Sequence, residues 1–310
     1  MLFTTYISPV STFFSENDIS YHQYADDTQI FLSLNPKNPS PTINTLSSLV
    51  LSLESWFLHN SLQLNPTKTE FIKLGTTFQL KSITDLNSIT IHDNISIPIS
   101  TNIKTLGIYL DSKLTFNKHI TSVIQSSNYH LRSIRHIRPL ISLDLAASLS
   151  RCLILSKLDY CNSLLYNISQ SELHRLQSIM NKAARITLDI PLTSTTHHNN
   201  DNLATLHWLP MQFRVPFKIA VITYKILSTA QPSYLNQLTS VKTLNRTLRS
   251  SSAIVLQNST PSTNISSRAF RYSAPTIWNS IPPSIRNSPS LSTFKSNLRT
   301  FYYQLAYINS

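Results

Sequence analysis

Residues 22–34 read HQYADDTQIFLSL, and this stretch determines how the first third of the chain is interpreted. Two short runs of β-prone residues, at 19–25 and 28–34, lie on either side of Asp26 and Asp27, which predicts a hairpin with these two residues as its loop. Exposed adjacent carboxylates at the end of a sheet are oxygen ligands of the kind that Mg²⁺ prefers. An Asp-Asp turn is also common because Asp tolerates turn geometry. The stretch by itself therefore leaves a metal site and an ordinary turn both open.

The sequence after this hairpin alternates between helix and strand. Ser40 is expected to cap a helix in which Pro41 is the first residue and which ends near Asn60. The apolar residues of this segment recur every three or four positions, as they do on one face of a helix. Further strands, which we expect to be antiparallel, are predicted at 69–74, 88–98 and 103–110.

The pattern becomes helical after Asp111. Pro139 is expected to end the first of these helices because proline cannot continue the backbone ladder. The polar tract TSTTHHNNDN at 193–202 is typical of a loop and predicts a domain boundary. The predicted helices cover 115–138, 142–158, 170–188, 214–228, 268–280 and 291–308.

Charge is distributed unevenly along the chain. The 26 Lys and Arg residues exceed the 14 Asp and Glu residues, which gives +12 at pH 7 and a sequence pI near 9.7. The net charge is −4 over residues 1–103, +5 over 104–201 and +11 over 202–310, and the last acidic residue is Asp201. Basic side chains among aromatic ones suit phosphate contacts and stacking on unpaired bases. The alternative is that these cations are only the solvated surface of a helical domain.

Composition excludes several classes of protein. Two glycines cannot form a G-x-G-x-x-G fingerprint or a phosphate-binding P-loop. Two cysteines cannot form a disulfide scaffold or a Cys-rich zinc module. The apolar N-terminus lacks a positively charged region, so we expect no secretory signal, and the apolar runs are shorter than the ~18 residues of a membrane span. We therefore expect a protein that is not secreted and has no membrane partner.

Several segments, in order, resemble the reverse transcriptase of non-LTR (LINE-type, jockey-like) retrotransposons. HQYADDTQIFLSL is similar to the catalytic hairpin of that family, and WFLHNSLQLNPTKTEFIKLG is similar to its next palm motif. IKTLGIYLDSKLTF resembles the strand that supports the primer. LDYCNSLLYNIS, LHWLPMQFRVPFKIAVITYKIL and SSRAFRYSAPTIWNSIPPSIRNSPSLSTFKSNLRTF resemble the region that follows the polymerase.

The resemblance implies an α+β fold in three parts. Residues 1–112 would be a truncated palm, with an antiparallel sheet plus a helix, 113–192 a helical thumb-like domain, and 203–310 a mostly helical, basic C-terminal domain. Asp26 would bind Mg²⁺ or Mn²⁺ with Asp27 beside it, and Lys68 would lie near the phosphates of the incoming nucleotide. An exposed lysine after an Asn-Pro turn is the alternative for Lys68. The arginines expected to contact nucleic acid are Arg132, Arg135 and Arg138 in the thumb and Arg246, Arg249, Arg268 and Arg271 in the C-terminal domain.

Parts of the family pattern are missing upstream of the hairpin. Met1 opens what resembles the tail of the preceding motif, so the fingers, the first palm Asp and a Gln-Gly-Ser block are absent from this sequence. We therefore expect little or no polymerase activity from this chain alone. The expected partners are an RNA template, a DNA primer and the missing N-terminal half, in a nuclear or cytoplasmic ribonucleoprotein. The alternative is a non-enzymatic nucleic-acid-binding remnant or a co-opted retrotransposon protein.

Overall fold

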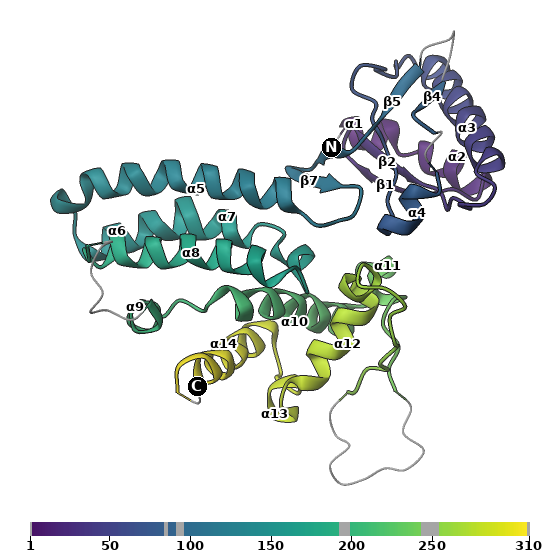
Figure 1. Cartoon of the computed structure of the whole chain (residues 1–310). Coiled ribbons are helices and arrows are strands. Elements are labelled where there is room, and N and C mark those ends of the chain that lie inside the picture. The colour runs from purple at the N-terminus through teal and green to yellow at the C-terminus, as the bar shows by residue number, and fades with distance from the viewer. Residues whose placement is uncertain (1, 84–85, 91–95, 192–198, 243–253, 309–310) are drawn as a thin grey trace. The chain divides into compact units, whose positions relative to one another are not determined.

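The computed structural model describes residues 2–83, 86–90, 96–191, 199–242 and 254–308. It is an α+β structure in which helices dominate and the strands are short (Figure 1). The chain divides into two compact units, each described here by itself. Unit 1 comprises Met1–Thr105 and Leu110–Leu114, and unit 2 comprises Leu106–Tyr109 and Thr115–Ser310. The segments predicted as thumb-like and C-terminal domains both lie in unit 2, and their functional labels remain predictions.

Unit 1 combines short strands with one long helix. The helices are α1 (Leu2–Ile7), α2 (Val10–Glu16), α3 (Ser40–His59) and α4 (Thr77–Lys81). The strands are β1 (Ser20–Tyr24), β2 (Asp27–Phe31), β3 (Phe71–Ile72), β4 (Ser88–Thr90), β5 (Ser96–Ser100) and β6 (Asn102–Thr105), followed by β7 (Ile108–Asp111), which pairs with β6. Strands lie within each expected segment, but 88–98 contains β4 and the start of β5, and 103–110 contains parts of β6 and β7. These strands form separate small sheets rather than one.

One strand pairing differs from the expectation of an antiparallel sheet. β4 and β5 are antiparallel, with Ile89 opposite Ile97, but β3 and β5 are parallel, with Phe71 opposite Ile99. A parallel pair needs a crossover connection, and here the chain passes through α4 and β4 between the two strands. Alternating side chains do not reveal strand direction, which explains why the sequence pattern missed the parallel pair.

The apolar face of α3 builds the core of unit 1. Leu53 and Phe57 are buried against Ile7, Val10 and Phe14 from α1 and α2. The helix begins one residue earlier than expected, because Pro39 occupies the cap position and Ser40 is already helical. The missing proline N–H would have no partner at a helix start, so proline is tolerated there.

Unit 2 is helical. Its helices are α5 (Asn117–Ile137), α6 (Leu143–Ser150), α7 (Ser156–Asp159), α8 (Gln170–Thr187), α9 (Asn199–Thr205), α10 (Met211–Thr229), α11 (Ser233–Asn236), α12 (Phe270–Ser280), α13 (Pro283–Arg286) and α14 (Leu291–Tyr307). A π-helical segment at Arg151–Leu155 divides the helix expected at 142–158 into α6 and α7. Short 3₁₀ turns lie at Arg138–Leu140, Asn162–Leu165 and Ser266–Arg268.

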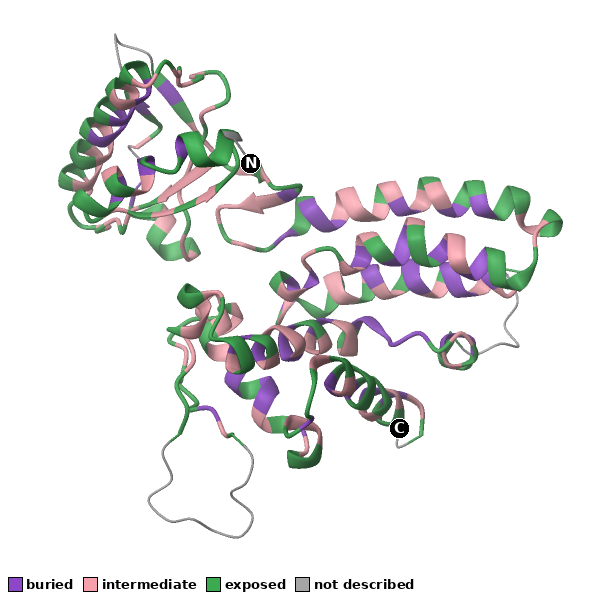
Figure 2. Ribbon diagram, turned by 180° about the vertical axis from the view of Figure 1, so that it is seen from behind, coloured by how far each residue is buried: buried purple, intermediate pink, exposed green. Residues whose placement is uncertain are grey.

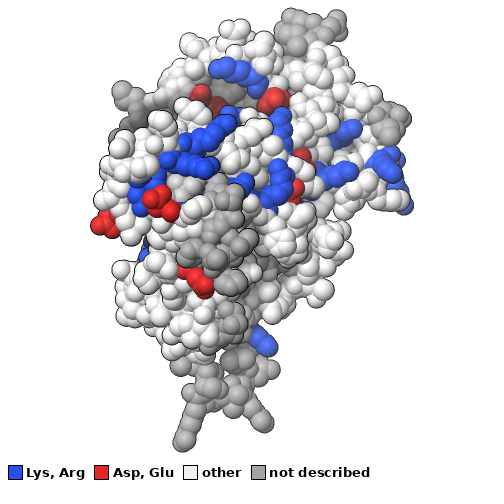
Figure 3. Space-filling model, turned by 60° about the vertical axis from the view of Figure 1, so that its left-hand side comes forward, with Lys and Arg blue, Asp and Glu red and all other residues white. Residues whose placement is uncertain are grey.

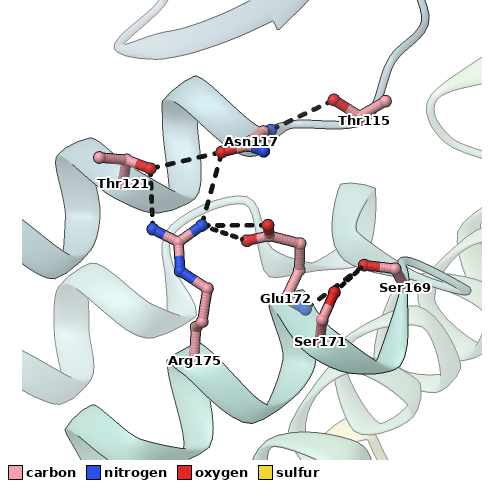
Figure 4. A network of polar contacts seen from close by, with 7 residues as sticks. All are labelled: Thr115, Asn117, Thr121, Ser169, Ser171, Glu172 and Arg175. Atoms are coloured by element: carbon pink, nitrogen blue, oxygen red, sulfur yellow. Dashed lines mark hydrogen bonds and ion pairs between the residues drawn. The ribbon is translucent and has the colours of Figure 1, made fainter.

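The packing of α5 on α8 follows their apolar stripes. Leu131 and Ile134 of α5 are buried, whereas Ile137 is exposed. A polar network fixes the other end of the pair (Figure 4). Arg175 of α8 forms an ion pair with Glu172, at 2.7 Å, and donates to Thr121 of α5, at 2.9 Å. Apolar contact and this guanidinium together set how α8 lies along α5.

An ion pair joins two segments that are distant in sequence. The Arg214 Nε atom at the start of α10 donates to Asp159 Oδ1 at 2.8 Å, and its Nη2 atom donates to Oδ2. Asn162 donates to the same Oδ1 atom at 3.2 Å. The Arg214 side chain is 16% exposed and that of Asp159 41% exposed. A planar guanidinium with two parallel bonds to a carboxylate fixes orientation as well as distance.

The last helices pack on α10 around aromatic residues. Tyr224, Trp278 and Phe294 come from α10, α12 and α14, and the rings of Tyr224 and Phe294 stack with centroids 4.4 Å apart. The Trp278 indole donates to the Ile254 carbonyl at 2.9 Å, so the segment beside α12 is held by a buried side chain. Figure 2 shows buried residues concentrated along α10 and α12 where they face their neighbours.

The Asp159–Arg214 pair is expected to stabilise unit 2. Replacing Asp159 by Asn leaves a largely buried guanidinium without its counter-charge, and we expect this to lower the free energy of unfolding by about 1–2 kcal/mol. Urea unfolding of Asp159→Asn, Arg214→Gln and the double variant measures this directly. A double variant as unstable as the sum of the single variants would show that the two side chains do not interact.

His119 of α5 should make stability depend on pH. Its side chain is only 6% exposed, and burial lowers its pKa below the usual 6.5. The unfolded chain therefore takes up a proton at a higher pH than the folded chain. The stability that neutral His119 contributes is fully present above about pH 6.5, the pKa in the unfolded chain. This stability is lost as the pH falls through the lowered pKa of His119 in the folded chain.

We expect the free energy of unfolding to fall between about pH 7.5 and about pH 5.5, and to fall less in His119→Gln. Urea midpoints at the two pH values measure the difference. His174→Gln, which changes an exposed histidine on α8, is the matched control and should keep the wild-type dependence. An identical pH dependence in wild type and His119→Gln would contradict the assignment.

Candidate functional site

The acidic hairpin forms, but its loop is shifted by one residue. Tyr24 pairs with Asp27 in the last rung of β1 and β2, so the two-residue loop is Ala25-Asp26 rather than Asp26-Asp27. Ala25 adopts φ 53°, in the left-handed region that non-glycine residues rarely enter. Because β-branched or larger residues are less tolerated there, a small residue before the carboxylates is physically reasonable.

Both carboxylates are available to solvent. Asp26 and Asp27 are exposed, and the Tyr24 ring beside them is 68% exposed. Asp26 is at the loop and Asp27 is the first residue of β2, so the side chains leave the backbone at adjacent positions. Two such groups can contribute oxygen ligands to a hard divalent cation that keeps several of its waters.

Apolar contact with α2 and a hydrogen bond to β6 hold the two strands of the hairpin in place. The Tyr21 ring of β1 stacks on buried Phe14, with centroids 4.4 Å apart. Gln29 of β2 donates to the Thr105 hydroxyl at the end of β6. The hairpin is therefore in contact with β6, at the start of the segment IKTLGIYLDSKLTF, within unit 1.

The hairpin offers fewer metal ligands than a complete two-metal site. Across the part of the chain that the structure describes, no three His, Cys, Asp or Glu side chains come together. Two-metal phosphoryl transfer places two ions ~3.5–4 Å apart, and both ions need ligands. Asp26 and Asp27 fit one side of such a site, and the groups needed to complete it are not among the described residues.

Lys68 lies on an ordered turn. The Asn65 side chain accepts from the Thr67 backbone at 3.0 Å, and its carbonyl accepts from the Lys68 backbone at 3.1 Å. The motif Asn-Pro-Thr-Lys-Thr is therefore an Asx turn that leaves Lys68 exposed. Its role beside a nucleotide remains a prediction.

The arginines predicted on α5 do not all share one environment. Arg132 and Arg135 are exposed on the surface of the helix. Arg138 is half-buried and donates to the carbonyls of Thr187, at 3.0 Å, and Ile141, at 2.9 Å. Arg138 therefore attaches the end of α5 to the end of α8, and it is less available for a phosphate than its two neighbours.

The C-terminal arginines also divide into groups. Arg246 and Arg249 lie outside the described residues. Arg268 is half-buried, whereas Arg271 is exposed and borders a hollow of about 220 Å³. Arg286 donates to the Ile254 carbonyl at 2.6 Å, and burial lowers the pKa of its guanidinium.

A basic groove on α8 was missed by the sequence reasoning. Its volume is about 390 Å³, and its cationic side chains are Lys182 and Arg185. His174, Ser178 and Lys182 recur every four residues, a polar stripe opposite the apolar one that could have revealed this groove. Figure 3 shows Lys and Arg side chains spread over the face that comes forward, with several Asp and Glu side chains beside them. Gln177, Asn181 and Asn199 complete its lining.

Comparison with known proteins supports the resemblance at a coarse level. The chain is similar to a probable RNA-directed DNA polymerase from transposon BS of Drosophila melanogaster, with 25% identity over 195 residues. The matched region covers 59% of this chain and 20% of that protein. The chain therefore has a distant relative among transposon reverse transcriptases and spans only about a fifth of that relative's length.

Other comparisons add no further assignment. No family model matches the chain, and no solved structure matches it. Among the described residues, none of the helices is both long enough and apolar enough to cross a membrane.

Proposed function

We propose that this chain is part of the RNA-directed DNA polymerase of a non-LTR retrotransposon. The observation that carries the proposal is the exposed hairpin at Tyr24–Asp27, which presents two adjacent carboxylates at a sheet end. Its contact with β6 through Gln29 and Thr105 supports the same assignment, because both segments belong to the resemblance. The similarity to a probable transposon RNA-directed DNA polymerase supports the coarser assignment to a reverse transcriptase.

The proposed reaction is nucleotidyl transfer to a DNA primer on an RNA template. The primer 3′-hydroxyl oxygen attacks the α-phosphorus of a nucleoside triphosphate, and pyrophosphate leaves. Bound Mg²⁺ or Mn²⁺ would stabilise charge on the attacking and leaving oxygens. Asp26 and Asp27 would hold the ion, and Lys68 would contact the nucleotide phosphates as a point charge.

Unit 2 is proposed to bind the nucleic acid. It carries twenty Lys and Arg residues against five Asp and Glu residues, a net charge of +15, whereas unit 1 has a net charge of −3. A strongly basic surface binds a phosphate backbone and releases its counterions. Arg132, Arg135 and Arg271 are exposed and suit this role, and Arg246, Arg249 and Arg268 remain candidates. A ribonucleoprotein in the nucleus or cytoplasm is the corresponding location.

A second candidate function is nucleic-acid binding without turnover. It is favoured by the hairpin's two carboxylates, which no third metal-binding side chain joins in the described ranges. Catalysis, by contrast, would require a complementary polymerase segment to supply the remaining ligands. The two candidates share the nucleic-acid surface and differ in whether the hairpin of this chain contributes to a polymerase active site.

We expect little or no primer extension by the chain alone, because one pair of carboxylates does not complete a two-metal site. The assay uses an RNA template, a DNA primer, deoxynucleotides and Mg²⁺, with Asp26→Asn as the variant and Glu70→Gln, an exposed acid in the same unit, as the control. Extension that disappears in Asp26→Asn and survives in Glu70→Gln would refute the expected inactivity and establish Asp26 as catalytic.

We expect the chain to bind an RNA–DNA duplex with an affinity that falls steeply as salt rises. Arg132→Gln/Arg135→Gln should weaken binding and reduce the slope of log K against log salt by about 2, one for each lost phosphate contact. Fluorescence anisotropy over a salt series measures the slope. Lys37→Gln/Lys81→Gln, two exposed cations of unit 1, should leave it unchanged; equal slopes for all three proteins would contradict a phosphate role for α5.

A further inference from the structure

Four exposed apolar residues lie close together in sequence at the turn between α5 and α6. We call this group the α5–α6 tip and define it by Ile137, Leu140, Leu143 and Leu145, whose exposed fractions are 36%, 85%, 47% and 48%. Single exposed apolar residues are normal on a protein surface, but a group within one short segment marks an interaction site.

Hydrogen bonds hold the backbone of the tip against the end of α8 and at the start of α6. Arg138 donates to the Thr187 and Ile141 carbonyls, which fixes the 3₁₀ turn against the end of α8. The Ser142 hydroxyl accepts from the Leu145 backbone at 3.3 Å and caps α6. The apolar side chains are therefore exposed by a defined backbone conformation, and they need no rearrangement to meet a partner.

Exposed cations precede and follow the tip in the sequence. Arg132 and Arg135 are exposed on the last turns of α5, and Arg151 is exposed just after α6. Asp144 is the single acidic residue between 130 and 158. Exposed apolar residues with exposed arginines nearby in the sequence suit a partner that combines flat apolar faces with negative charge, as the bases and phosphates of a nucleic acid do.

We infer that the α5–α6 tip packs on exposed bases of the bound nucleic acid, while Arg132 and Arg135 contact the adjacent phosphates; this inference rests on the proposed nucleic-acid function of unit 2. Leu and Ile side chains that meet a base face remove apolar surface from water on both sides. Bases are exposed where strands separate or where a single strand begins. The tip would therefore favour a junction between paired and unpaired strands over a blunt duplex.

Two labelled probes test the inference with the full chain. One is a blunt RNA–DNA duplex, and the other is the same duplex with a forked, unpaired end. Wild type should bind the forked probe about tenfold more tightly, which corresponds to about 1.4 kcal/mol. Leu140→Ser/Leu143→Ser should lose this preference and keep the affinity and salt slope for the blunt probe.

The control removes apolar surface elsewhere in unit 2. Leu305→Ser/Ile308→Ser changes exposed residues at the end of α14, with exposed fractions of 38% and 66%, and should keep the forked-end preference. Circular dichroism of both double variants should match wild type, because the four side chains are on the surface.

Several results would overturn the inference. If Leu140→Ser/Leu143→Ser keeps the preference for the forked probe, or if wild type binds both probes equally, the tip does not contact bases. Nucleic-acid binding by unit 2 would still stand. Failure of wild type to bind either probe at low salt would end both proposals. Tip-dependent binding to phosphatidylserine vesicles, with no forked-end preference, would assign the tip to a lipid surface instead.

Discussion

The two-bond ion pair between Asp159 and Arg214 is the contact on which the helical unit most depends. Asp159 ends α7 and Arg214 lies in the first turn of α10, so the pair sets where α10 begins relative to the α5–α8 layer. Gln177 of α8 accepts from the Met211 backbone at 2.8 Å and satisfies an N–H that would otherwise lack a partner at the start of α10. Since α12 and α14 both pack on α10, this placement extends to the rest of the unit.

The acidic hairpin follows from a different constraint. Its loop has only two residues, so the rung formed by Tyr24 and Asp27 fixes both carboxylates at one end of β1 and β2. Phe14 behind Tyr21 and the Gln29–Thr105 bond keep the strands in place. Residues 24–27 are all exposed, so the loop end of the hairpin is available to solvent. Unit 1 thus separates a packed core from an exposed acidic end.

Periodicity allowed much of the fold to be predicted. α3, α5 and α8 begin and end close to the predicted positions because each has an apolar face long enough to identify. The hairpin loop was predicted one residue late, since nothing in the sequence indicates that Ala25 takes a left-handed conformation. The parallel pairing of β3 with β5 was missed because it joins segments separated by α4 and β4. Local patterns carry little information about such pairings.

The candidate site was predictable where it depends on local sequence. The acidic pair and the exposed Arg132 and Arg135 depend on local sequence, and the structure places them on the surface. Arg138 instead donates a hydrogen bond to the Thr187 carbonyl, which is available only because α8 ends there. The groove at Lys182 and Arg185 likewise needs α9 beside α8 before it becomes a hollow. Tertiary contacts decide which cations are structural and which are free to bind.

We propose that unit 2 binds the nucleic acid of a transposon polymerase. Photo-crosslinking tests it most directly: the full chain is mixed with a template–primer that carries 4-thiouridine, irradiated, digested and analysed by mass spectrometry. The account predicts crosslinked peptides from α5, α6 and α8, lost when salt is raised, since the contacts are electrostatic. Crosslinks confined to unit 1, or none in unit 2 at low salt, would contradict it.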